Sequence, residues 1–212
     1  INIILNASLL WRTQAQIDSS MKKIFMMAIV LLATVCSVNA QVADEIQKSK
    51  ERAEKLQQLC DGYKASGVGN IDGYGNAVKD AAAFAIMNSV KLENMYKRQI
   101  GETVDGVTDV TVTKPTLEEW ITFGATVAGE GLKLKEATDQ AKAAGEEAKA
   151  MAENAKNEKN PMKAAKAAKA AKAAAAVVTF GNDATVILGE ETAAQGKAVN
   201  EIIETLKSGK NL

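Results

Sequence analysis

The sequence contains no histidine among its 212 residues, and only 4% of its residues are aromatic. Histidine is the commonest general base, the usual partner of a catalytic Ser or Cys, and a frequent metal ligand. Its absence excludes Ser-His-Asp and Cys-His nucleophile pairs and every imidazole metal site. The chain also lacks net charge, with 26 basic and 26 acidic residues. It therefore has no global attraction to nucleic acid or to acidic lipid.

The segment 21–40 has the pattern of a secretory signal peptide. A cationic start at residues 21–23 precedes twelve uncharged, largely apolar residues at 24–35. Val38 and Ala40 are small and lie three residues and one residue before a cleavage point at Gln41. We therefore predict export to the periplasm or the extracellular space, with a mature chain that begins at Gln41.

Other interpretations of this region fit less well. A membrane anchor needs about twenty apolar residues, more than this segment has. A lipoprotein would be acylated at Cys36, but the bulky Val35 before it fits that processing site poorly. Residues 1–20 lack an initiating Met and precede a complete signal. We interpret them as upstream sequence that was translated from an early start, outside the fold.

Cysteine is scarce in the predicted mature chain, where only Cys60 remains. A single Cys excludes an internal disulfide, so we expect a buried thiol, with an intermolecular bridge as the alternative. The segment 41–212 carries 23 basic and 25 acidic residues, a net charge of minus two. Because Cys60 is the only cysteine left after cleavage, the exported chain is predicted to have no internal disulfide to stabilise it.

The mature chain is predicted to be all-α, with four helices in a single domain. Apolar or small residues recur at helical spacing from Val42 to Tyr63, which predicts a helix over 42–64. Five glycines between 62 and 75 predict a loop, and Asn76 is expected to cap a helix over 76–100. This second helix is apolar nearly all the way round, so we expect it to be the most buried.

Two longer helices are predicted in the second half of the chain. Thr116 and Glu119 form a capping box that starts a helix over 116–157. Asn160 and Pro161 then fit the cap and first turn of a helix over 161–208. We expect these two to form a long antiparallel hairpin, with the two shorter helices packed at its base.

Residues 102–115 are β-branched and partly alternating, which is typical of extended structure. They either fold back as a small hairpin at Asp105-Gly106 or lie extended across the helices, and we favour the extended form. An exposed edge there would offer a place for a partner strand.

The expected hairpin narrows from large to small side chains toward its turn. Between residues 137 and 176, 18 of 40 residues are alanine, so this end is expected to pack by close, coiled-coil-like backbone approach. Each glycine inside a helix costs about 1 kcal/mol against alanine. We expect close contacts between the helices to compensate for this cost in stability. The alternative is that the helices bend when the protein functions. The small residues proposed to pack in this way are Gly124, Gly131, Gly145, Gly181, Gly189 and Gly196.

A basic patch is the main candidate interaction surface. Lys163, Lys166, Lys169 and Lys172 recur every three residues and fan over about 180° of the helix. We expect them to be solvated or paired with glutamates across the hairpin. Binding to an anionic surface such as lipid headgroups is the alternative, whereas nucleic-acid binding is disfavoured because aromatic stacking residues are absent there.

No arrangement of residues indicates catalysis, a cofactor or a metal. The adjacent carboxylates Glu118-Glu119 and Glu190-Glu191 face different ways on a helix and are interpreted as surface charges. No segment after residue 40 is expected to span a membrane, because Asn182 and Asp183 interrupt the most apolar stretch. We therefore expect a non-enzymatic interaction or scaffolding protein of the bacterial cell envelope, with an unidentified protein partner or a second copy. A holdase-like periplasmic chaperone and a bundle that binds a small apolar ligand are the alternatives.

Overall fold

A computed structural model of the chain describes residues 40–101, 103–104, 107–108, 111–210 and 212. Residues 42–212 form one compact unit. The predicted upstream segment 1–20, the lipoprotein alternative at Cys36 and all but the last residue of the predicted signal peptide lie outside the described residues.

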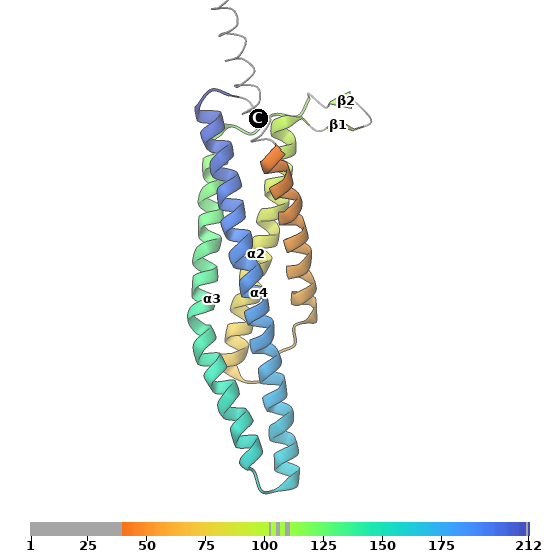
Figure 1. Cartoon of the computed structure of the whole chain (residues 1–212), viewed down its shortest axis with the longest axis vertical. Helices are drawn as coiled ribbons and strands as arrows, with labels where there is room; N and C mark the ends of the chain where they lie inside the picture. Colours follow the sequence, from red (N-terminus) through yellow and green to blue (C-terminus); the bar gives the residue numbers. More distant parts are fainter. Residues whose placement is uncertain (1–39, 102, 105–106, 109–110, 211) are drawn as a thin grey trace, which may run out of the picture. The chain divides into compact units, whose positions relative to one another are not determined.

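The described part of the chain is all-α apart from one short hairpin of strands (Figure 1). Its helices are helix 40–62, α2 (Gly69–Ile100), α3 (Leu117–Asn157) and α4 (Pro161–Lys207). Val42, Ile46 and Leu56 on helix 40–62 are buried, as their spacing predicted. The prediction of an all-α protein is therefore confirmed.

The start of α2 differs from the expectation of a glycine-rich loop over 67–75. The helix begins at Gly69, seven residues before the predicted cap at Asn76. The carboxylate of Asp72 accepts hydrogen bonds from the backbone amides of Ser66 (2.7 Å) and Gly67 (2.9 Å), which ties the loop to the first turn. Glycine is needed at Gly75, where a Cβ atom would lie 2.6 Å from the ring of Tyr63. Gly75 therefore serves helix packing, whereas a Cβ at Gly62, Gly67 or Gly69 would have no neighbour within 4 Å.

The segment after α2 is a small hairpin, so the favoured prediction of an extended crossing was wrong. β1 (Thr103–Val104) pairs antiparallel with β2 (Val107–Thr108). Thr103 lies opposite Thr108, a register that brings the chain back on itself within a few residues. β-branched residues favour strands, and the nearest partner for such a strand was its own continuation.

Local signals define the starts of both α3 and α4. Thr116 caps α3 by accepting from the amide of Glu119 (3.2 Å), while Glu119 accepts from the amide of Thr116 (2.7 Å). The side chain of Asn160 accepts from the amides of Met162 and Lys163, and Pro161 takes the first position of α4. Both predicted caps are confirmed.

α3 and α4 lie side by side and run in opposite directions (Figure 1). Gly124 faces Val199 and Gly131 faces Thr192, so positions that advance along α3 meet positions that recede along α4. α2 covers the part of this pair nearest the chain ends, with Tyr74 packed against Gly181. Towards the connection at 158–160, α3 and α4 continue past the start of α2 (Figure 1). We call this end, residues 142–181, the tip.

The core is built mainly from α2 and α4. α2 buries thirteen of its 32 residues, against seven of 41 in α3, in agreement with the prediction that it is the most buried helix. α4 is also long and apolar enough, by length and composition, to cross a membrane, a criterion that the sequence was expected not to meet. Its Phe180, Ala184 and Leu188 are instead packed in the bundle core. Core helices commonly have this composition, so it does not by itself indicate a membrane span.

Candidate functional site

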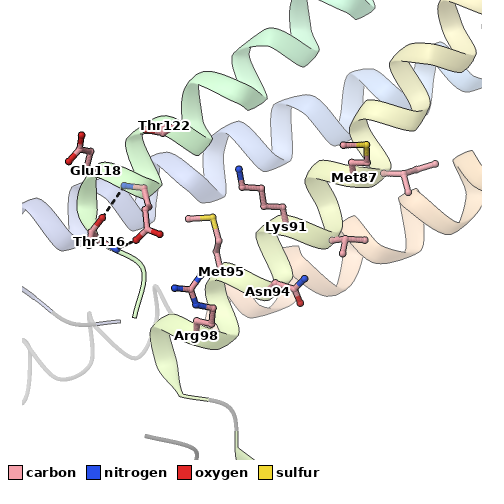
Figure 2. Close-up of a pocket in the computed structure, with 11 residues that line it drawn as sticks. Met87, Lys91, Asn94, Met95, Arg98, Thr116, Glu118 and Thr122 are labelled. Atoms are coloured by element: carbon pink, nitrogen blue, oxygen red, sulfur yellow. Dashed lines mark hydrogen bonds between the residues drawn. The ribbon is translucent and has the colours of Figure 1, made fainter. Parts of the chain in front are cut away.

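The outer face of α2 exposes large apolar side chains. Met87 is 65% exposed and Val90 is 54% exposed, although α2 otherwise packs closely into the bundle. They lie beside a groove of about 800 Å³ between α2 and the start of α3, which we call the α2 groove. Figure 2 shows Met95 and Lys91 projecting from α2 toward α3 across this groove. α2 is thus buried on most sides, as the sequence predicted, and exposed on this one side.

Charged groups of both signs border the α2 groove. Lys91 Nζ lies 5.2 Å from the ring centroid of Phe123, and the Arg98 guanidinium donates to the carbonyl of Thr113 at 2.8 and 3.0 Å. On the α3 side, hydrogen bonds from the backbone and hydroxyl of Thr116 lower the pKa of Glu119. The groove thus combines an apolar floor with a polar, charge-balanced rim.

A second feature lies inside the bundle, where a buried polar layer joins all four helices. Its members are Ser49 and Arg52 of helix 40–62, Asn88 of α2, Glu130 of α3, and Glu191, Thr192 and Gln195 of α4. Glu130 and Glu191 are both fully buried. A charged residue is rarely buried without a partner, so the two carboxylates need separate accounts.

Glu191 is the member of the layer that contacts a cation. Arg52 Nε donates to its Oε2 at 2.6 Å, and the Ser49 hydroxyl and the Gln195 amide donate to its Oε1. Arg52 also contacts Glu45, so the guanidinium joins a buried carboxylate to a partly exposed one. The prediction that Glu191 is a surface charge was wrong, whereas its neighbour Glu190 is exposed.

Glu130 has a different environment. Asn88 Nδ2 donates to its Oε2 at 2.8 Å, and no cation contacts it among the described residues. The hydroxyl oxygen of Thr192 lies 2.7 Å from Glu130 Oε1 and 2.8 Å from the Leu188 carbonyl oxygen. A hydroxyl has one proton and cannot donate to both. A protonated Glu130 satisfies the geometry, because its own O–H donates to Thr192, whose proton then goes to Leu188.

Burial points to the same protonation state. Desolvation raises the pKa of Glu130, and the negative charge of Glu191 on α4 adds to that effect. The hydrogen bond that Asn88 donates acts in the opposite direction but is the smaller effect. Desolvation and the hydrogen-bond geometry thus both favour the neutral form of Glu130, whereas Glu191 has a guanidinium partner.

A repeating register could have located both carboxylates from the sequence. Glu191 continues the buried series Ala184, Leu188, Glu191, Gln195 and Ala198. Glu130 continues the corresponding series Phe123, Val127, Glu130, Leu134 and Ala137 on α3. The hydrophobic period thus held the information to place each residue in the interior, although Glu191 was interpreted as a surface charge. It did not show which polar side chains of the other helices contact these carboxylates in the interior.

The lysines proposed as an interaction surface lie on α4 in the tip. Lys163, Lys166, Lys169 and Lys172 are all exposed, and none forms an ion pair with a described residue. The α2 groove and the buried polar layer lie elsewhere in the bundle, so the structure does not bring these lysines together with either feature.

The six glycines predicted to pack between helices differ in the space around them. A Cβ at Gly181 would lie 2.3 Å from the Tyr74 ring, and Gly124 and Gly131 face side chains of α4. Gly145, Gly189 and Gly196 have no neighbour within 4 Å of such a Cβ. Close packing therefore requires glycine at Gly181, whereas a Cβ at Gly124 or Gly131 would make ordinary contacts and one at the other three would make none within 4 Å.

Other titratable groups of the described residues include a single cysteine. Cys60 is a free, half-buried thiol whose pKa is raised by burial. Over the residues that the structure describes, no group of three or more His, Cys, Asp or Glu side chains could hold a metal ion. The α2 groove and the exposed lysines are two surfaces through which the described bundle can meet other molecules.

Comparisons of the chain with protein-family models, with curated proteins and with solved structures found no match.

Proposed function

We propose that this chain is an exported, non-catalytic interaction protein of the bacterial cell envelope, which holds a helix of another protein against the α2 groove. In this proposal the α3–α4 pair is a coiled-coil-like, alanine-rich hairpin, and helix 40–62 and α2 pack at its base. The interaction is with protein and needs no cofactor or metal.

One observation carries the proposal: the bundle leaves Met87 and Val90 more than half exposed on its most buried helix. Burying a Met or Val side chain contributes roughly 1.5–3 kcal/mol, so leaving both in water forgoes a substantial gain. Ala83, Met87 and Val90 follow one another at helical spacing along the same exposed face. Such a row matches the apolar stripe of a partner helix, and methionine adapts readily to irregular partners.

A small apolar ligand is a second candidate, because the groove has the volume of a ligand pocket. Ligand pockets enclose most of their occupant, however, and residues as exposed as Met87 enclose little. A ligand would raise the melting temperature of residues 41–212 when it binds. A shift with hydrophobic small molecules that disappears in Met87→Ser/Val90→Ser would favour this candidate over a protein partner.

Site-specific photo-crosslinking in the producing cells tests the proposal. A photoreactive residue at position 87 or 90 should give a defined cross-linked protein, and one at the exposed position Asn200 on α4 should not. Absence of cross-links at 87 and 90, or the same products from position 200, would contradict it. Cross-links to many unfolded proteins would instead indicate the holdase alternative.

The export part of the proposal has its own test. N-terminal sequencing of the protein from a periplasmic or secreted fraction should begin at Gln41.

Light scattering on residues 41–212 distinguishes a second copy of the chain from a different protein as the occupant of the α2 groove. A dimer that dissociates in Met87→Ser/Val90→Ser would identify a second copy as the partner and contradict a different protein.

A further inference from the structure

We propose that the tip docks on an anionic phospholipid bilayer through Lys163, Lys166, Lys169 and Lys172, with Met162 entering the headgroup region. We call these four residues the lysine face. The inference goes beyond the proposed protein interaction, because it concerns the opposite part of the bundle and a different class of partner.

Charge is distributed very unevenly along the bundle. The tip, residues 142–181, carries eight lysines and four glutamates, whereas the rest of the segment 41–212 carries 15 basic and 21 acidic residues. On α4 itself no acidic residue occurs between Pro161 and Asn182. The near-neutral total therefore conceals a positive tip and a negative remainder, and the tip would be the part that an anionic surface attracts.

The lysine face is free to bind. All four side chains are exposed, and the glutamates expected to pair with them across the hairpin form no ion pair with them in the described part of the chain. The exposed positions between the lysines, such as Ala165 and Ala168, are alanines that do not shield the charges. Lysine side chains extend well beyond alanine, so several ammonium groups can reach one plane.

Met162 points to a bilayer and not to a soluble polyanion. It is 85% exposed, the highest value among the exposed large hydrophobic residues, and it lies beside Lys163 at the first turn of α4. An exposed apolar side chain flanked by cations is the combination that interfacial membrane binding uses: the cations meet the headgroups and the apolar group enters the boundary. A soluble polyanion would gain nothing from the methionine.

Vesicle flotation of residues 41–212 tests the inference. The protein should bind vesicles of equal phosphatidylcholine and phosphatidylglycerol and should not bind pure phosphatidylcholine. Each lysine close to an anionic bilayer contributes roughly a fivefold gain in partitioning, so Lys→Gln at all four positions should lower binding at least about a hundredfold. Binding should also weaken strongly between about 0.05 M and 0.5 M salt.

A matched variant controls for net charge. Lys55, Lys64, Lys114 and Lys210 are equally exposed but lie outside the tip. Their quadruple Lys→Gln variant should bind as wild type does, since the same charge is lost at the wrong place. Met162→Ser should lower binding severalfold without changing the salt dependence. Circular dichroism should show that every variant retains its helices.

Three outcomes would overturn the inference. The first is that the protein does not bind phosphatidylglycerol vesicles. The second is that the two quadruple lysine variants lose vesicle binding equally. The third is that the protein binds soluble polyphosphate but not vesicles. The Met87→Ser/Val90→Ser variant should bind vesicles normally, so a failure here leaves the proposed α2 interaction untouched and is distinguishable from a failure of that proposal.

Discussion

Glu130 offers the most incisive test of the buried polar layer, because its substitution by glutamine reproduces the neutral acid. In Glu130→Gln the amide oxygen can accept from Asn88 Nδ2, and the amide nitrogen can donate to the Thr192 hydroxyl. The proton that Thr192 then donates to Leu188 is unchanged. We therefore expect the variant to match wild type in stability wherever Glu130 is protonated in both the folded and the unfolded state.

The pH dependence has a definite sign. Burial raises the pKa of Glu130 in the folded protein, so the folded state holds this proton over a range of pH in which the unfolded state has released it. The stability that the neutral acid contributes is fully present below the unfolded value, about 4.3, and is lost as pH rises through the raised folded pKa. Within that window wild type should lose up to about 1.4 kcal/mol per pH unit relative to Glu130→Gln.

Urea unfolding of residues 41–212 between pH 4 and 9 measures this difference, since the other titrating groups are common to both proteins. Glu191→Gln should behave in the opposite way and lose about 2–4 kcal/mol at pH 7, because it leaves the partly buried Arg52 without its buried partner. Glu190→Gln, at an exposed position, should change stability by less than about 0.5 kcal/mol.

Two results would refute the reasoning. The first is a constant difference between wild type and Glu130→Gln across the whole pH range, which would mean that Glu130 is already ionised in the fold. The second is an equal loss in Glu130→Gln and Glu191→Gln at pH 7, which would mean that both carboxylates are charged partners in one network.

Two further predictions concern packing and capping. Gly181→Ala should lower the unfolding free energy by about 1–3 kcal/mol, because the new Cβ meets the Tyr74 ring. Gly189→Ala should raise it by about 0.5–1 kcal/mol, because this position has open space within a helix. Equal effects of the two substitutions in urea titrations would contradict these expectations. Thr116→Ala and Asn160→Ala should each lower the melting temperature through a loss of about 1 kcal/mol, and additive losses in the double variant would show that the two helix starts are independent.

The sequence determined much of the helical framework by itself. The capping box at Thr116 and the Asn160-Pro161 start are complete within a few residues, so the bounds of α3 and α4 follow from local chemistry. The period of Val42, Ile46 and Leu56 likewise identified the buried face of helix 40–62. Such features involve only neighbouring residues, and no distant contact is needed to decide them.

Only the tertiary structure decided what each face meets. It extended α2 back to Gly69, which places Gly75 inside the helix and against Tyr63 and Val177. It also left Met87 exposed on a helix that is apolar nearly all the way round. It also placed Glu130 and Glu191 in the interior with partners on other helices. A helical period specifies the direction of a side chain, but its environment depends on residues that are distant in the chain and close in space. The protonation state of Glu130 depends on the same distant residues.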